Sequence, residues 1–66
     1  MKVYFENSRG IRREIATVEN EEEAYRVIYQ FCADRKFQVY YSSSWVENNE
    51  TVVDVGSWSE FFYISA

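Results

Sequence analysis

One stretch of the chain, residues 20–35, has the periodicity of an amphipathic α-helix, and it limits what the rest can form. Its apolar side chains recur at spacings of three and four residues and form a single stripe: Ala24, Val27, Ile28, Phe31 and Cys32. Asn20 can accept a hydrogen bond from the first-turn amides, and Glu23 follows three residues later, which is a capping-box pattern. A helix of this length spans about 24 Å. A single helix of that length covers only part of a four- or five-stranded sheet.

The segments on either side of the helix are predicted to be short strands, because they alternate apolar with polar residues or are rich in aromatic and β-branched ones. Strands are expected at 2–5, 11–18, 37–46, 51–55 and 61–65, with turns at 7–10 and 47–50. Placing Ile11, Ile15 and Thr17 inward on the second strand also turns Arg13 inward unless a β-bulge intervenes. The sequence therefore predicts one α+β domain over residues 1–66, ordered ββαβββ, with a mainly antiparallel sheet and the helix packed on one face.

Strand alternation assigns the side chains of this sheet to two faces. The helix side is expected to carry Val3, Phe5, Ile15, Val39, Val53, Val55, Phe62 and Ile64. The outer side is expected to carry Tyr4, Tyr40, Val52, Phe61 and Tyr63. This outer set is largely aromatic and carries little charge, and a contiguous apolar patch of this kind is typical of an interface. The alternative is that sheet twist, loops and the two tryptophans cover these rings.

The residue types narrow the chemistry that the chain can perform. There is no histidine and only one cysteine, Cys32, so a serine or thiol nucleophile lacks its usual base and no intrachain disulfide can form. The two glycines stand apart, which excludes a Gly-rich phosphate loop. Asp54 with Glu60 is the carboxylate pair best suited to acid–base work, but no other part of an active site accompanies it. We therefore expect a protein that is not an enzyme and uses no cofactor or metal.

The segment DVGSWSEFF, residues 54–62, combines signals for a turn and for a helix start. Ser57 and Glu60 match the S-x-x-E pattern of a helix N-terminus, whereas the aromatic and β-branched residues that follow favour a strand. We predict a tight connection in which the hydroxyls of Ser57 and Ser59 bind turn amides and Glu60 reaches back to one. Gly56 relaxes the backbone at the bend.

Four segments together carry a resemblance to known proteins. EEEA at 21–24, YYSSSW at 40–45, DVGS at 54–57 and EFFY at 60–63 resemble small uncharacterised prophage-encoded proteins of Gram-positive bacteria. That type has no established activity, so the resemblance implies a phage or mobile-element accessory protein in the bacterial cytoplasm and no catalytic residues. The unpaired cysteine and the absence of an apolar run behind a basic start agree with a cytoplasmic location. No stretch approaches the roughly 20 apolar residues of a membrane span.

The small core, the missing catalytic groups and the aromatic outer face predict a non-enzymatic interaction module. It is expected to bind another protein, itself as a homodimer, or both. The predicted contact residues are Tyr4, Tyr40, Phe61 and Tyr63, with Trp58 as a hot spot.

Two other binding functions remain open. In single-stranded nucleic-acid binding, the outer rings would stack on bases while Arg9, Arg12 and Arg13 contact the backbone, although a net charge of −4 opposes this. In nucleic-acid mimicry, carboxylates would stand in for phosphates: Glu19, Glu21, Glu22, Glu23, Asp54 and Glu60. Stabilisation of the helix dipole is a simpler reason for acids in the first helical turn.

Overall fold

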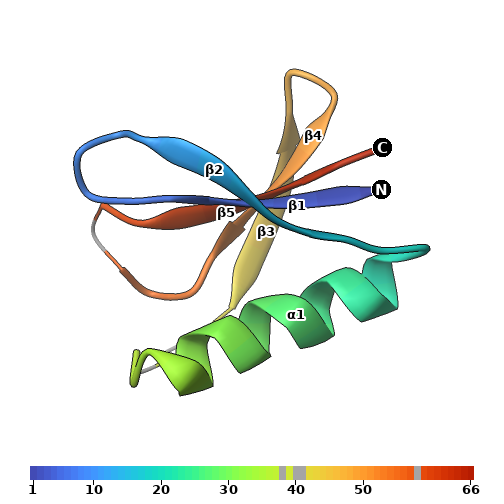
Figure 1. Cartoon of the computed structure of the whole chain (residues 1–66). Coiled ribbons are helices and arrows are strands. Elements are labelled where there is room, and N and C mark those ends of the chain that lie inside the picture. The colour runs from blue at the N-terminus through green and yellow to red at the C-terminus, as the bar shows by residue number, and fades with distance from the viewer. Residues whose placement is uncertain (38, 40–41, 58) are drawn as a thin grey trace.

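The computed structural model describes residues 1–37, 39, 42–57 and 59–66, and these form an antiparallel sheet with a helix packed on one face (Figure 1). The described elements are, in chain order, β1 (Lys2–Glu6), β2 (Arg12–Thr17), α1 (Glu21–Asp34), β3 (Ser43–Glu47), β4 (Glu50–Asp54) and β5 (Phe61–Ser65). The strand order across the sheet is β2-β1-β5-β4-β3. The last strand thus lies between the two hairpins. The predicted α+β fold in the order ββαβββ is confirmed.

Both hairpins end in the turns that the sequence predicted. In the β1–β2 turn, Oδ1 of Asn7 accepts hydrogen bonds from two backbone amides at 2.9 and 3.1 Å, and Gly10 has φ +78°. In the β3–β4 turn, Asn48 and Asn49 have φ +52° and +63°. Two consecutive left-handed residues are typical of a two-residue hairpin whose twist matches that of its strands.

A β-bulge interrupts the pairing of β1 with β2. Val3 pairs with Ala16, whereas the next residue of β1, Tyr4, pairs with Glu14, so Ile15 is the extra residue. The bulge reverses which residues of β2 face the helix beyond this point.

This bulge corrects part of the predicted orientation of β2. Thr17 was expected to face inward, but it lies on the outer face, and Ala16 packs against the core in its place. Ile15 is partly buried against the core, as expected. Ile11, also expected inward, is 59% exposed because it precedes the strand at the rim of the sheet.

The N-terminus of α1 is capped as the sequence predicted. The side chain of Asn20 accepts a hydrogen bond from the amide of Glu23 at 2.9 Å. The carboxylate of Glu23 in turn accepts from the amide of Glu19 at 3.2 Å, one residue earlier than in a standard capping box. The helix runs from Glu21 to Asp34, within one residue of the predicted 20–35 at each end.

The C-terminus of α1 closes in a Schellman motif without glycine. The amide of Lys36 donates to the carbonyl of Ala33 at 3.2 Å, and the amide of Phe37 donates to the carbonyl of Cys32 at 2.8 Å. Lys36 has φ +58°, a left-handed conformation that costs a residue with a Cβ about 1–2 kcal/mol. The helix end therefore carries local strain at one exposed side chain.

The core lies between α1 and the central strands β1 and β5. Its largest fully buried side chains are Phe62, Ile28, Val3, Val53 and Cys32. The ring of Phe5 joins this core to the end of the helix, with centroids 4.8 Å from Phe31, 5.2 Å from Phe62 and 6.1 Å from Phe37. Each fully buried side chain of this size contributes about 1.5–3 kcal/mol. Among the described residues, no polar or charged side chain is fully buried.

Outside β2, the inward face is correctly predicted except at one position. Val39 was expected inside, but it is 39% exposed. The strand predicted at 37–46 is wrong at this end: Val39 is not in a strand and β3 begins at Ser43, so strand alternation does not apply to Val39. The expected partners Val53 and Val55 are both buried in the core.

Replacing Lys36 with glycine should stabilise the protein. Lys36→Gly relieves the left-handed strain, whereas the larger backbone entropy of glycine in the unfolded chain opposes part of this gain. The net effect that we expect is an increase of about 0.5–1 kcal/mol in the free energy of unfolding. Denaturant unfolding measures it. Lys36→Ala is the matched control, because it removes the same charge but keeps the Cβ and should leave stability nearly unchanged. Equal gains in both variants would show that charge, not backbone strain, matters here.

Candidate functional site: the outer sheet face and an arginine pocket

The strand register places most of the predicted contact residues on the sheet face away from α1. Tyr4 of β1 pairs with Tyr63 of β5, which pairs with Val52 of β4, which pairs with Trp45 of β3. Phe61 lies two residues before Tyr63 in the same strand and so shares this face. Tyr4, Phe61 and Tyr63 are all half-buried.

The other two predicted contact residues, Tyr40 and Trp58, lie outside the described part of the chain.

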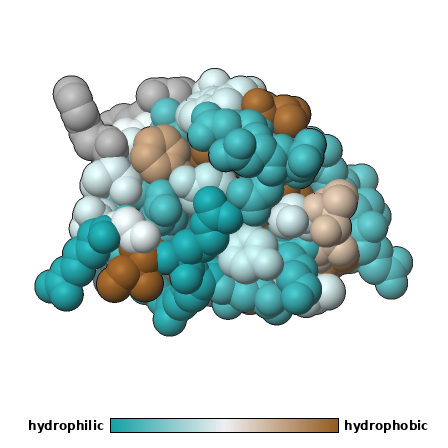
Figure 2. Space-filling model, turned by 90° about the horizontal axis from the view of Figure 1, so that it is seen from above, coloured by the Kyte–Doolittle hydropathy of each residue, from teal (hydrophilic) through white to brown (hydrophobic). Residues whose placement is uncertain are grey.

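The expectation that the outer face carries little charge is wrong. Seen from above, this face shows hydrophilic residues spread between small apolar areas (Figure 2). The guanidinium of Arg12 lies over the ring of Tyr63, with Cζ 3.6 Å from the ring centroid, and its Nη1 donates to both carboxylate oxygens of Glu50 at 2.9 Å. This side chain crosses from β2 over β1 and β5 to β4, and so covers one of the predicted contact rings. A cation over an aromatic face is attracted by the ring quadrupole.

Tyr63 is also fixed through its hydroxyl, which donates to Oε1 of Glu6 at 2.8 Å. Burial raises the pKa of Tyr63, and the hydrogen bond and the negative charge of Glu6 raise it further, against the opposing effect of Arg12. The folded protein therefore favours the neutral phenol. Tyr63 is held between Arg12 and Glu6 and is not a freely available anchor.

The apolar part of the outer face lies toward β3. The indole of Trp45 packs edge-on against Phe61, with ring centroids 6.4 Å apart, while remaining 41% exposed. Val52 is only 5% exposed, and Val46, on the opposite face of β3, is 76% exposed. Trp45 was not among the predicted contact residues. Its period-two spacing with Ser43 and Glu47 next to the Asn-Asn turn was the available signal.

The two edges of the sheet differ in how well they are protected against pairing. The β2 edge carries Arg12, Arg13 and Glu14 together with the bulge at Ile15, and charges and bulges are common devices against edge-to-edge association. All residues of β3 are exposed, and Glu47 is the only charged one. The β3 edge therefore lacks the protection that the β2 edge has.

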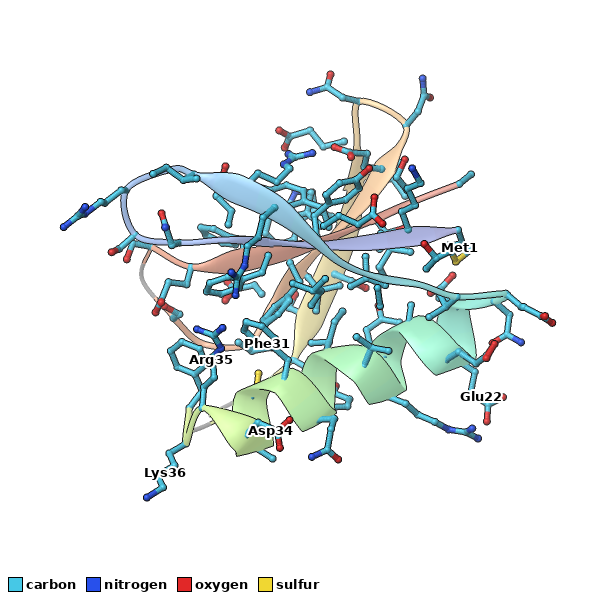
Figure 3. The ribbon with its side chains drawn as sticks, viewed as in Figure 1. Met1, Glu22, Phe31, Asp34, Arg35 and Lys36 are labelled. Atoms are coloured by element: carbon cyan, nitrogen blue, oxygen red, sulfur yellow. The ribbon has the colours of Figure 1, made fainter. Side chains whose placement is uncertain are left out.

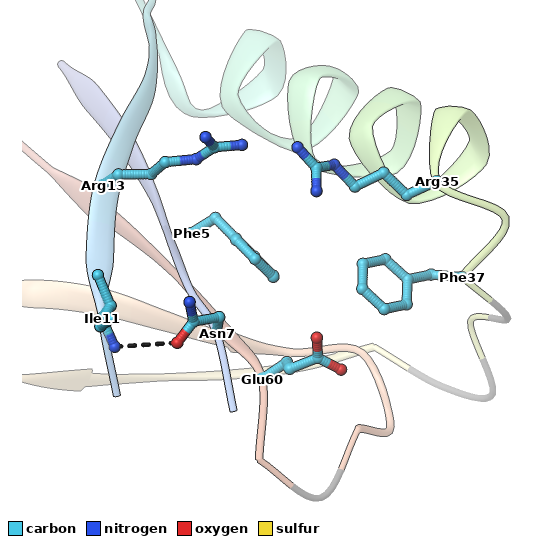
Figure 4. Close-up of a pocket in the computed structure, with 7 residues that line it drawn as sticks. All are labelled: Phe5, Asn7, Ile11, Arg13, Arg35, Phe37 and Glu60. Atoms are coloured by element: carbon cyan, nitrogen blue, oxygen red, sulfur yellow. Dashed lines mark hydrogen bonds between the residues drawn. The ribbon is translucent and has the colours of Figure 1, made fainter. Parts of the chain in front are cut away.

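A pocket of about 450 Å³ lies on the other side of the sheet, beside the end of α1 (Figure 4). It is lined by Phe5, Asn7, Ile11, Arg13, Arg35, Phe37 and Glu60. The side chains of Arg13 and Arg35 extend toward each other from β2 and from the helix end, and the rings of Phe5 and Phe37 lie between them and Glu60 (Figure 4). The inward orientation of Arg13, expected unless a bulge intervened, follows from its pairing with Phe5 ahead of the bulge.

The charges in this pocket are unevenly paired. Within the described part of the chain, neither Arg13 nor Arg35 forms an ion pair with a carboxylate. Arg35 instead packs on an aromatic ring, with Cζ 4.4 Å from the centroid of Phe31. The carboxylate of Glu60 accepts a hydrogen bond from the hydroxyl of Ser57 at 3.1 Å. With two guanidinium groups and the single carboxylate of Glu60 in its lining, the pocket carries a net positive charge.

The predicted turn chemistry of residues 54–60 is confirmed at Ser57. Its Oγ accepts from the amide of Glu60 at 3.3 Å, while Oδ1 of Asp54 accepts from the amide of Gly56 at 2.8 Å. Asp54 and Glu60 thus both contribute to the structure of this connection. Gly56 has φ +94°, which a side chain would disfavour.

The remaining candidate group for chemistry, the thiol of Cys32, lies in surroundings that suit a structural role. Cys32 is 1% exposed, and burial, with a smaller contribution from Glu60, raises the pKa of its thiol. In the described residues there is no group of three or more side chains placed to hold a metal. None of the described helices is long and apolar enough to cross a membrane.

The structure separates the residues that the two nucleic-acid hypotheses bring together. Arg12 lies on the outer face with Glu50, whereas Arg13 lies in the pocket on the helix side. Glu22 lies at one end of α1 and Arg35 at the other (Figure 3), and Glu60 lines the pocket beside Arg35. The acids proposed for mimicry are therefore divided between the two ends of the helix.

Comparison of the chain with protein-family models, with curated proteins and with solved structures finds no match.

Tyr63→Phe should lower stability and change its dependence on alkaline pH. Loss of the hydrogen bond to Glu6 should cost about 1 kcal/mol of unfolding free energy at neutral pH. Because the pKa of Tyr63 is raised in the folded state, its contribution is complete below the pKa of an unfolded tyrosine, about 10, and is lost as pH rises above it. The difference between wild type and Tyr63→Phe should thus shrink at high pH.

Chemical unfolding at several pH values measures this difference. Tyr4→Phe is the matched control, since the hydroxyl of Tyr4 has no hydrogen bond within the described structure, and it should cost little at neutral pH. Equal destabilisation by the two substitutions would contradict the role assigned to Tyr63.

Proposed function

We propose that this chain is a non-enzymatic interaction module that forms a homodimer by antiparallel pairing of β3 with β3 of a second copy. The observation that supports this most directly is the difference between the edges of the sheet. β3 is exposed along its whole length and carries one charge, whereas β2 is charged and bulged. An open edge of this kind offers a row of backbone donors and acceptors to another strand.

A second copy is favoured as the occupant because β3 is complementary to itself. With the two-fold axis at Trp45, the two indoles meet at the centre and each Glu47 lies opposite a Ser43. No like charges then face each other across the pair, which avoids a known source of destabilisation. The pairing also adds the exposed side chains of Trp45 and Val46 to the contact.

The pairing of two five-residue strands is small, so the dimer is expected to be in equilibrium with the monomer. Interfaces at the small end of the size range are typically weak and transient. In the dimer the outer faces of two sheets become one continuous surface, on which Phe61 remains available to a partner protein. An accessory role for a phage or mobile element, implied by the sequence resemblance, stays a prediction.

A charged side chain on the β3 edge should abolish the dimer. Val46→Lys places a charge on the exposed edge strand without disturbing the core, because Val46 is 76% exposed. Wild type should show a mass that rises from monomer to dimer with concentration in sedimentation equilibrium, whereas Val46→Lys should stay monomeric.

Thr17→Lys is the matched control. It introduces the same charge at an exposed position of the opposite edge strand, β2, and should dimerise as the wild type does. A wild-type protein that remains monomeric at millimolar concentration, or a dimer that Thr17→Lys breaks and Val46→Lys does not, would contradict the proposal.

A further inference from the structure

We propose that the pocket between β2 and the end of α1 binds a nucleoside monophosphate, with its phosphate between Arg13 and Arg35. These two side chains come from separate elements and point toward each other across the mouth of the pocket (Figure 4). A pocket of about 450 Å³ is within the range of small-ligand sites. It lies on the helix side of the sheet, away from the edge at β3, so this inference does not depend on the proposed dimer.

The two guanidinium groups favour a dianion between them, whereas the carboxylate of Glu60 lies beyond the rings of Phe5 and Phe37. Among the described residues, no carboxylate pairs with Arg13 or Arg35, so the two guanidinium groups repel each other when the pocket is empty. A phosphate monoester supplies two negative charges and three oxygens, which accept the paired donors of two guanidinium groups. Asn7 lines the pocket farther from the arginines; its Oδ1 is occupied by turn amides, so its Nδ2 is left as a donor to another part of the ligand.

The rest of the pocket fits a ring that carries hydrogen-bond donors. Phe5 and Phe37, whose centroids are 6.1 Å apart, give an aromatic surface next to the arginines. Any of the nucleobases can stack on such a surface, because each base has a π-face. Beyond the rings, Glu60 presents a carboxylate held by Ser57. That carboxylate accepts hydrogen bonds from ribose hydroxyls or from an exocyclic amine.

The same features disfavour a phosphorylated aromatic side chain as the ligand. The ring of a phenyl phosphate has no donor group, so Glu60 would be placed against it without a hydrogen bond. Recognition by Glu60 therefore distinguishes a nucleotide from phosphotyrosine, although both would engage the two arginines.

The test is a titration of the full chain with adenosine monophosphate, phenyl phosphate and inorganic phosphate, followed by amide NMR shifts and calorimetry. Adenosine monophosphate should bind most tightly and shift the amides of residues that line the pocket. Arg13→Gln and Arg35→Gln should each weaken its binding by about tenfold or more, since a charge-assisted pair is lost. Glu60→Gln should weaken adenosine monophosphate but leave phenyl phosphate unchanged.

Arg9→Gln is the matched control, because it removes the same charge from the exposed β1–β2 turn outside the pocket lining. It should bind adenosine monophosphate within about twofold of the wild type, because salt screens the long-range interaction of this exposed charge with the ligand. All three arginine positions are exposed, so these variants are expected to fold.

Three outcomes would overturn the inference. The first is the absence of pocket shifts with any of the three compounds at millimolar concentration. The second is binding that Arg13→Gln and Arg35→Gln reduce no more than Arg9→Gln does. The third is phenyl phosphate binding as tightly as adenosine monophosphate, or adenosine monophosphate binding that Glu60→Gln leaves unchanged. Either form of the third result would show that Glu60 does not select a nucleotide.

Discussion

The packing of one helix over the two central strands is the constraint on which the rest of the structure depends. α1 inserts Ala24, Ile28 and Cys32 against β1 and β5, and this contact buries most of the core. In the part of this 66-residue chain that the structure describes, there is no second helix to cover the other face or the edges. Small domains bury a low fraction of their surface for this reason. The outer face must therefore be stabilised by its own side chains.

On the outer face, long polar side chains take the place of a second layer. Arg12 lies over the ring of Tyr63 and binds Glu50, while Glu6 binds the Tyr63 hydroxyl. The aliphatic part of an arginine can cover apolar surface while its charge stays hydrated. This arrangement protects β1 and β5 but does not extend to β3, where Trp45 remains partly exposed. The protected and unprotected halves of one face explain why the open edge is at β3.

The sequence predicted local structure well, but it predicted poorly which residues that are distant in the chain come into contact. The cap at Asn20, the turn at Asn48 and the face of Phe61 all follow from short-range chemistry, and each was expected. The contact of Arg12 with Glu50 was not, because these residues are 38 positions apart and meet only when β5 lies between the hairpins. For the same reason the pocket of Arg13 and Arg35 was missed. The bulge at Ile15 was foreseen as an option, but its effect on Thr17 needed the strand pairing.

In the proposed dimer, β3 is an open edge to which a second strand is added. Amide hydrogen exchange, measured strand by strand over a range of protein concentrations, is the decisive test of this pairing. The amides of Ser43–Glu47 that point away from β4 should exchange quickly in dilute protein and become slower as concentration rises, while those of β2 should not change. Exchange in β3 that is independent of concentration, or slowing confined to β2, would contradict it.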